Sequence, residues 1–345
     1  MPGIFFYSLT DATICRNIFN CRKCFLSVLL HTMFQFIRRL KIAYAVYNFF
    51  HRKELVHNTA LLKKYGIKKN YFSSLSSSDF RHLAGSEKTA AIDPAVVLSA
   101  LYRHTSSANQ ESIQSFEENG FLIIRNYITV QQADAINIEI DQLLANKKVK
   151  PGHRNKIMFA IYHSALLRSI GNDQQLLDFL GALMHGEAAL FQSINFSMGS
   201  EQRTHSDSIH MTTYPEGGLL GVWIALDDIS ESNGPLHYYP GSHKLPYYLN
   251  SDYDNEGSAW LIGDKSYTAY EEMIAAKIND IGLPKKIFTA SKGDLLVWHA
   301  NLFHGGEPHT DKNKTRKSMV LHYFKKGAIC YHEITQRPAI IKQQR

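Results

Sequence analysis

The chain has 345 residues, 44% of them hydrophobic and 20% charged, which is ordinary for a soluble globular protein with a sizeable core. Its net charge of +7 is unevenly placed: residues 1–70 contain 12 lysines and arginines and 2 acidic residues, and the remainder carries a net charge of −3. Because the basic character belongs to the N-terminal region, the charge does not indicate a nucleic-acid-binding protein, and no nucleic-acid partner is expected.

The first residues contain most of the cysteines. Cys15, Cys21 and Cys24 lie there, but no second pair or histidine follows at zinc spacing. Since the rest of the chain has no disulfide framework, we expect a cytoplasmic protein. The apolar run 25–37 is interrupted by polar residues and is shorter than the ~20 residues that span a bilayer. Residues 1–32 are predicted to be a poorly ordered extension.

Residues 33–70, the helical arm, have helical periodicity from about Phe34 to Tyr65. An apolar stripe is formed by Phe36, Leu40, Ala43, Tyr47 and Phe50, and the other side contains Arg38, Arg39, Lys41, Arg52 and Lys53. Two interpretations remain open. The helix packs on the domain with its basic face in water, or residues 34–66 contact an anionic membrane or an acidic partner peripherally.

A linker and several helices lie between the helical arm and the main set of strands. Residues 71–110 are interpreted as a polar linker with a short helix at 94–104. A helix over 111–119 ends at Gly120, a suitable C-cap residue, and is followed by a strand at 121–124. Thr129 is expected to cap a helix over 130–145, because apolar residues recur there at three- and four-residue spacing.

Short strands dominate the remainder. A helix is predicted at 174–184, and strands at 188–198, 219–226, 236–239, 286–288, 294–298 and 316–324. Residues 245–285 break this rhythm and are interpreted as an insertion with a helical piece near 270–279. This Tyr-rich insertion is a candidate lid or substrate-recognition element, or else a surface elaboration. Residues 331–345 are interpreted as a C-terminal tail. Helices followed by many short strands predict a mainly β fold with flanking helices, in which a jelly-roll core occupies 111–330.

One triplet suggests a metal site. His205-Ser206-Asp207 lies in a segment with few helix signals, and in a strand residues i and i+2 point to the same side. An imidazole and a carboxylate would then converge, which is two thirds of the 2-His-1-carboxylate triad that binds Fe(II) and leaves coordination positions open. A second histidine must come from elsewhere in the chain.

The C-terminal third offers that histidine and an anion-binding group. His299 and His304 both follow a buried strand, and His304 precedes two glycines. Arg316, Ser318, Val320 and His322 would share one face of a later strand. A buried arginine on that face requires an anion, and a carboxylate would satisfy its donors bidentately.

These motifs, in this order, resemble the phytanoyl-CoA dioxygenase family of Fe(II)/2-oxoglutarate oxygenases. Besides the ligands, the chain contains an opening Phe116–Phe121 motif, a central strand Gly221–Asp228, and the turn residues Asn233-Gly234-Pro235-Leu236 with Pro240-Gly241-Ser242-His243. The resemblance covers about residues 113–324. It implies a double-stranded β-helix core of the jelly-roll, cupin-like kind.

The resemblance also implies a set of site residues. His205, Asp207 and His304 would bind Fe(II), and His304 is preferred to His299 because it lies 12 residues before Arg316. The cofactor-binding positions are Arg316, Trp223, Lys156, Ile194 and Ser318, and the candidate substrate-pocket residues are Gln192, Asn195 and His210. Many relatives have serine where this chain has Gly306, so the hydrogen bond of that serine must be absent or come from Thr315, Ser318 or water.

The function implied is a dioxygenase that consumes 2-oxoglutarate and O2 and hydroxylates an aliphatic carbon of a small or medium organic substrate. Asp207 favours hydroxylation over halogenation, because the related halogenases lack this carboxylate. Two alternatives remain: a zinc hydrolase or isomerase that uses the same ligands, and a non-catalytic, membrane-associated binding module. The sequence does not specify the substrate or the oligomeric state.

Overall fold

A six-stranded antiparallel sheet forms the centre of the molecule. The computed structural model describes residues 36–83 and 93–341, so the extension predicted at 1–32 lies outside the described residues. The strand order is β1-β8-β5-β10-β3-β2. These strands are β1 (Phe121–Ile124), β8 (Leu295–His299), β5 (Leu219–Ala225), β10 (Ser318–Lys325), β3 (Ala188–Phe196) and β2 (Lys156–Met158).

Two three-stranded sheets complete the β structure. One has the order β7-β6-β9 and contains Lys286–Phe288, Leu236–Tyr238 and His304–Gly306, respectively. The other has the order β12-β11-β4 and contains Arg337–Pro338, Ile329–His332 and Thr212–Tyr214. Tyr238 of β6 and Phe288 of β7 pack with Trp223 and Val320 of the large sheet in one buried cluster. The large sheet therefore has an inner face, which meets β6 and β7, and an outer face.

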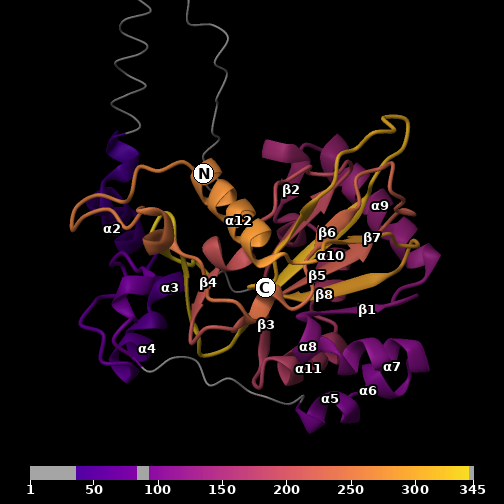
Figure 1. Cartoon of the computed structure of the whole chain (residues 1–345), viewed down its shortest axis with the longest axis horizontal. Coiled ribbons are helices and arrows are strands. Elements are labelled where there is room, and N and C mark those ends of the chain that lie inside the picture. The colour runs from indigo at the N-terminus through magenta and orange to yellow at the C-terminus, as the bar shows by residue number, and fades with distance from the viewer. Residues whose placement is uncertain (1–35, 84–92, 342–345) are drawn as a thin grey trace, which may run out of the picture.

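Helices cover the outer face (Figure 1). Because side chains alternate along a strand, Val222 and Val297 point outward and join residues of α9 (Val130–Ala145) and α11 (Gln174–Leu183) in the largest core cluster. Thr129 caps α9 as expected, by accepting a hydrogen bond from Gln132 N. Each large apolar side chain buried here stabilises the fold by about 1.5–3 kcal/mol. At the bottom of Figure 1, α11 lies with four shorter helices, α5 (Pro94–Leu98), α6 (Ala100–Arg103), α7 (Ser107–Gln114) and α8 (Phe116–Asn119).

The structure differs from the sequence predictions in several places. The helix predicted at 34–65 is interrupted at His51 and Val56, giving α2 (Lys41–Phe50), α3 (Arg52–Leu55) and α4 (Asn58–Lys64). The insertion contains α12 (Tyr267–Ile281), longer than expected, and α10 (Ala165–Gly171) was not predicted. The segment interpreted as a tail from 331 is instead part of the fold, because β12 pairs with β11. Elements as short as α3, α10 and β12 have too few residues for their periodicity to be recognised in the sequence.

A buried carboxylate joins the edge strand β1 to β8. Asp294, 1% exposed, accepts hydrogen bonds from the backbone nitrogens of Asn126 and Ser291, at 3.0 and 2.9 Å, and pairs with Arg125 at 2.6 Å. The preceding Gly293 has φ +97°, and a Cβ there would lie 2.2 Å from Ile128 O, so only glycine fits this turn. The turn into β8 is thereby held against the end of β1.

We expect Asp294→Ala to lower the free energy of unfolding by about 2–4 kcal/mol, because two backbone N–H groups lose a charged acceptor. The measurement is chemical denaturation followed by circular dichroism. Lys326→Ala, which breaks the exposed pair with Glu187, is the control and should change stability by less than about 0.5 kcal/mol. Equal effects of the two variants would contradict the role assigned to Asp294.

Candidate active site

Two histidines meet where segments distant in the sequence pair. His205 and His304 form an isolated antiparallel bridge, with both backbone N–H···O distances at 2.9 Å. Their ring centroids are 4.6 Å apart. The β9 residue His304 is placed by its pairing with Tyr238 of β6. The sequence suggested that residues 205–207 form a strand. Instead, a 3-10 helix, η4 (Asp207–Ile209), begins at Asp207.

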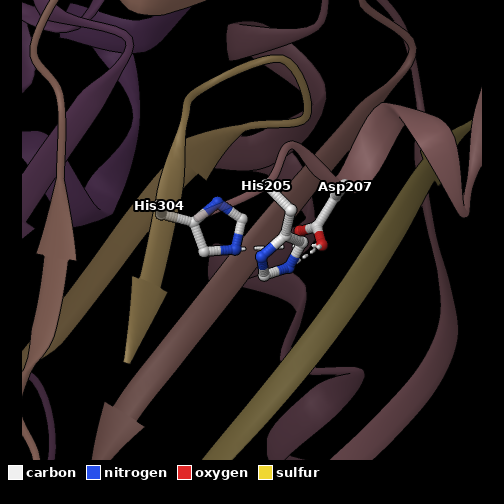
Figure 2. Close-up of side chains that lie close together, drawn as sticks. All are labelled: His205, Asp207 and His304. Atoms are coloured by element: carbon white, nitrogen blue, oxygen red, sulfur yellow. Dashed lines mark ion pairs between the residues drawn. The ribbon is translucent and has the colours of Figure 1, made fainter. Parts of the chain in front are cut away.

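Asp207 completes a cluster that could hold a metal ion. One ligand atom from each of His205, Asp207 and His304 lies within 4.8 Å of the other two, and all three residues are buried (Figure 2). Asp207 Oδ1 lies 3.8 Å from Nε2 of each histidine. The second oxygen, Oδ2, accepts a hydrogen bond from Trp298 Nε1 at 2.8 Å and lies 3.3 Å from His322 Nε2. One oxygen is thus fixed by the protein while the other faces the histidines.

The imidazoles are set for metal binding. Nδ1 of His205 lies 2.9 Å from the carbonyl of Arg203, and Nδ1 of His304 lies 2.9 Å from that of Leu302. A carbonyl can only accept, so each Nδ1 donates its proton and each Nε2 carries the lone pair that can bind a metal; on His205 this lone pair faces the amide nitrogen of Gln202 at 3.0 Å. Burial, with a smaller contribution from His304, lowers the pKa of His205 to about 3, so this ring is neutral at pH 7. The donor set therefore fits a divalent metal ion.

The Asp207 side chain is ionised, which is the form that binds a metal ion. Burial by itself would raise the pKa of Asp207, but the imidazoles of His304 and His322 outweigh it and hold the pKa well below its ordinary value. Trp298 and His322 therefore support the candidate metal site through their contacts with Asp207. The sequence predicts His322 on the inner face of its strand but does not indicate its contact with Asp207. No local sequence pattern indicates a role for Trp298.

Arg316 is a buried cation at the inner face. It is 2% exposed, donates from Nε to Gly234 O at 3.1 Å and from a terminal nitrogen to Ser318 Oγ at 2.9 Å. Its guanidinium lies 5.0 Å from the Trp223 ring centroid. Burial lowers its pKa to about 10, so it stays charged at pH 7. Among the described residues no carboxylate pairs with it, which makes it a strong candidate to bind an anionic ligand.

Lys156 supplies a second cation. Burial lowers its pKa to about 8, and its Nζ donates to Gln202 Oε1 at 2.8 Å. The amide nitrogen of Gln202 lies 3.0 Å from His205 Nε2, so this side chain connects Lys156 with the histidines. The sequence gave no reason to select Gln202, three residues before His205.

The other residues expected in the pocket lie on two different faces of the large sheet. Ile194 and Trp223 belong to the inner cluster, and Ser318 contacts Arg316. Gln192 is also on the inner face, with its amide nitrogen 3.2 Å from His322 Nδ1. The prediction for Asn195 is wrong. Asn195 follows the inward-facing Ile194 along β3, so its side chain points to the outer face, near Asn137 and Ile140 of α9. A strand's two-residue period puts Gln192 and Asn195 on opposite sides.

His210 lies in an aromatic group next to the site. Its ring centroid is 6.2 Å from that of His205, 4.7 Å from Tyr267 of α12 and 5.5 Å from His332 of β11. Tyr270 of α12 contacts Ser206 Oγ at 2.9 Å. The two tyrosines come from the insertion, which the sequence offers as a candidate lid or substrate-recognition element. His332 comes from the segment interpreted as a tail, so the sequence did not connect it with the site.

His299 lies away from the cluster. It follows Trp298 along β8 and so points to the other side, where its ring is 5.5 Å from that of His243. Its Nδ1 accepts from Asn301 N at 3.1 Å. The structure therefore brings His304, and not His299, to Asp207.

The position of Gly306 leaves little room for a side chain. A Cβ there would lie 3.2 Å from Glu201 N and 3.3 Å from Ser200 Oγ. Thr315 donates to Asp227 Oδ2 at 2.6 Å and is therefore engaged elsewhere. Of the two side chains considered as substitutes for the missing serine, only Ser318 contacts Arg316.

Comparisons with known proteins agree with this arrangement. The family model "Phytanoyl-CoA dioxygenase (PhyH)" matches residues 116–318, more than half of the chain. The chain belongs to the phytanoyl-CoA dioxygenase family. Its buried cluster of two histidines and one aspartate fits the iron site of a non-haem dioxygenase.

Curated relatives are distant. A phytanoyl-CoA dioxygenase domain-containing protein 1 homolog of Caenorhabditis briggsae is 23% identical over 269 residues, covering 62% of this chain and 90% of the relative. The zebrafish (Danio rerio) phytanoyl-CoA dioxygenase domain-containing protein 1 is 22% identical, covering 39% and 65%. The ectoine dioxygenase of Halomonas elongata is 26% identical, covering 56% and 63%. The chain thus spans slightly less than two thirds of the zebrafish and bacterial relatives.

Solved structures share the fold. The 2-oxoglutarate-dependent carbocyclase SnoK from nogalamycin biosynthesis is 16% identical with a TM-score of 0.57, covering 71% of this chain and 96% of that one. EctD from S. alaskensis with 2-oxoglutarate and 5-hydroxyectoine is 18% identical with a TM-score of 0.52, covering 77% and 94%. The expected fold class, a mainly β jelly-roll core with flanking helices, is confirmed.

Trp298→Phe should weaken Fe(II) binding by about 10–100-fold, because Asp207 Oδ2 loses the donor that fixes its orientation while the aromatic packing is largely kept. Anaerobic titration calorimetry measures the affinity. Trp223→Phe is the matched control: its indole N–H has no hydrogen-bond partner among the described residues, so Fe(II) affinity should be unchanged. Normal affinity in Trp298→Phe would rule out the positioning role.

The buried His299 should make stability sensitive to acid. Burial, and then His243, lowers its pKa to about 3, whereas an unfolded histidine titrates near ~6.5. Its contribution is therefore complete above pH ~6.5 and is lost as the pH falls toward the folded-state value, since only the unfolded chain takes up the proton.

His299→Gln should accordingly reduce the slope of unfolding free energy against pH, between about pH 4 and 6, by up to about 1.4 kcal/mol per pH unit. Denaturation at a series of pH values provides this slope. The exposed His163→Gln is the control and should leave it unchanged. If both variants keep the wild-type slope, His299 is not buried as a neutral ring.

Proposed function

We propose that this chain hydroxylates an aliphatic C–H bond of a small or medium organic substrate while 2-oxoglutarate is decarboxylated to succinate and CO2. His205, Asp207 and His304 hold Fe(II), and Arg316 binds the distal carboxylate of 2-oxoglutarate. The observation that carries the proposal is the buried Arg316 guanidinium, which has no carboxylate partner among the described residues and lies at the inner face of the same sheet that supplies Trp298 and His322.

The ligand set is suited to this chemistry. Two neutral imidazoles and one carboxylate leave coordination positions open for a bidentate keto acid and O2. When bound, the iron supplies the oxidising power for attack on an unactivated C–H bond, driven by decarboxylation of the co-substrate. The presence of Asp207 favours hydroxylation over halogenation, which would need an open position for chloride in place of the carboxylate.

The chain's own residues position the reactants. Arg316 offers a fork of donors whose direction is set by Gly234 O and Ser318 Oγ, so a carboxylate can be bound bidentately without reordering the side chain. Trp223 and Ile194 form apolar walls beside it, and Lys156 adds a second positive charge near the triad. Excluding water around these cations strengthens their attraction for a dianion.

The substrate would lie on the side covered by α12. Tyr267 and Tyr270 face the triad segment, and the neighbouring Glu271 is 3% exposed with Oε2 3.9 Å from Arg203. His210 and His332 complete this wall, and we assign substrate recognition to it, with Gln192 at its inner end. The named substrate of one relative, ectoine, is a small molecule, which agrees with the size of substrate proposed.

The zinc alternative is less well supported. A hydrolase or isomerase that used the same three ligands would have no role for a buried, unpaired arginine, whose desolvation is costly without an anionic partner. A non-catalytic binding module would not need the two carbonyl contacts that orient both imidazoles.

The test is anaerobic addition of Fe(II) and 2-oxoglutarate to the apo-protein. A weak visible absorption band should appear, and Arg316→Ala should weaken 2-oxoglutarate binding by about 100-fold while Fe(II) affinity changes by less than about threefold. Arg316→Lys should retain part of the affinity, and the exposed Arg103→Ala is a control that should behave as wild type. Absence of the band in folded protein, or equal loss of metal and co-substrate binding, would refute the assignment.

Hydroxylation itself needs a separate measurement, because the structural relatives include a carbocyclase. With ¹⁸O2 and a turned-over substrate, one labelled oxygen should enter the product and one the succinate. A product without label would leave the iron and 2-oxoglutarate sites in place and exclude hydroxylation.

A further inference from the structure

The helical arm exposes an apolar face that the domain does not cover. Fifteen large apolar side chains are exposed in the described residues, and eight of them lie between Phe36 and Val56. On α2, the side chains of Ile42, Val46, Phe49 and Phe50 are 54–78% exposed, and their spacing places them along one side of the helix. Such a concentration is unusual for a protein surface that meets only water.

This exposed face overlaps only in part with the stripe predicted from the sequence. Phe50 belongs to both. Leu40 of the stripe instead lies on the side through which the helix contacts the protein, together with Tyr44 and Asn48. Asn48 is buried and donates to Phe72 O at 3.2 Å, and Arg337 lies over the Tyr44 ring at 5.1 Å. The polar contacts thus face inward, and the exposed apolar side chains face outward.

The insertion holds the start of α2 in place. Lys41 N donates to Trp260 O, and Ile262 N donates to Arg39 O, both at 2.9 Å. Trp260 is itself 74% exposed and lies beside the first turn of the helix. Tryptophan is enriched where a bilayer meets water, because its ring is apolar and its N–H is polar. The exposed apolar surface therefore extends from α2 to the 260 loop.

Positive charge surrounds this surface. Residues 36–70 contain nine lysines and arginines and one acidic residue. Arg52, Lys53, Lys63 and Lys64 on α3 and α4 are exposed. A second copy of the chain docked symmetrically through this face would bring two such sets of cations together, which is unfavourable. An anionic surface offers both the charge and the apolar layer that the arm requires.

We propose that the helical arm docks on an anionic lipid bilayer. Ile42, Val46, Phe49 and Phe50 enter the interface between headgroups and acyl chains, while the basic residues of α3 and α4 contact the lipid phosphates. None of the helices in residues 36–83 and 93–341 is long and apolar enough to span a membrane. This docking is peripheral. It also places the insertion, which continues from Trp260 into α12, next to the bilayer (Figure 1).

Vesicle co-sedimentation of the full chain tests the proposal. The chain should sediment with phosphatidylcholine vesicles that contain about 30 mol% phosphatidylserine, and not with pure phosphatidylcholine. Binding should fall steeply in about 1 M salt, which screens the charges. The double variants Phe49→Glu/Phe50→Glu and Arg52→Glu/Lys53→Glu should each weaken binding by at least about tenfold.

Matched controls separate this from a general surface effect. Leu98→Glu changes an apolar side chain that is 66% exposed on α5, and Lys148→Glu/Lys150→Glu reverses two charges after α9; both should bind as wild type. Thermal melts verify that every variant is folded. No sedimentation with anionic vesicles, equal binding to neutral ones, or equal losses in the control variants would overturn the proposal. So would gel filtration showing that the α2 variants abolish a dimer while vesicle binding is unaffected.

Discussion

The site depends on the fixed orientation of the Asp207 carboxylate, whose two oxygens have different partners. Trp298 and His322 hold Oδ2, from β8 and β10, so that Oδ1 is left between the Nε2 atoms of His205 and His304. Trp298 fits over β5 because Gly221 has no side chain: a Cβ there would lie 2.2 Å from the indole ring. The orientation of one carboxylate is therefore determined by three adjacent strands of the large sheet.

Two buried cations lie near the same point. Lys156 and Arg316 have pKa values that burial lowers to about 8 and about 10. Asp207 and the buried Glu271 act on Lys156, whereas Arg316 has only the neutral acceptors Gly234 O and Ser318 Oγ among the described residues. A buried guanidinium without a carboxylate is costly, and the same electrostatics would give an anionic co-substrate its affinity.

Residues with a motif or a period could be predicted from the sequence, and residues that depend on tertiary contacts could not. The H-x-D triplet and the inner-face Arg316 follow from spacing and alternation, and α9 follows from its cap and apolar repeat. The choice of His304 over His299 follows from the family resemblance. Asn195 was placed in the pocket although the same alternation puts it outside. Trp298, Gln202 and His332 have no local signature, because each reaches the site only through the folding of a distant segment.

The insertion connects the two parts of the molecule that the sequence analysis treated separately. Its first half pairs with the start of α2, and its second half, α12, covers the triad with Tyr267 and Tyr270. The helical arm and the active site are consequently joined through one continuous segment.

Anomalous diffraction at the iron edge, from crystals grown anaerobically with Fe(II), tests the central claim most directly. The account predicts one strong peak within bonding distance of His205 Nε2, His304 Nε2 and Asp207 Oδ1, with Asp207 Oδ2 still held by Trp298. A peak at any other group, or a carboxylate turned away from both histidines in the iron-loaded crystal, would contradict it.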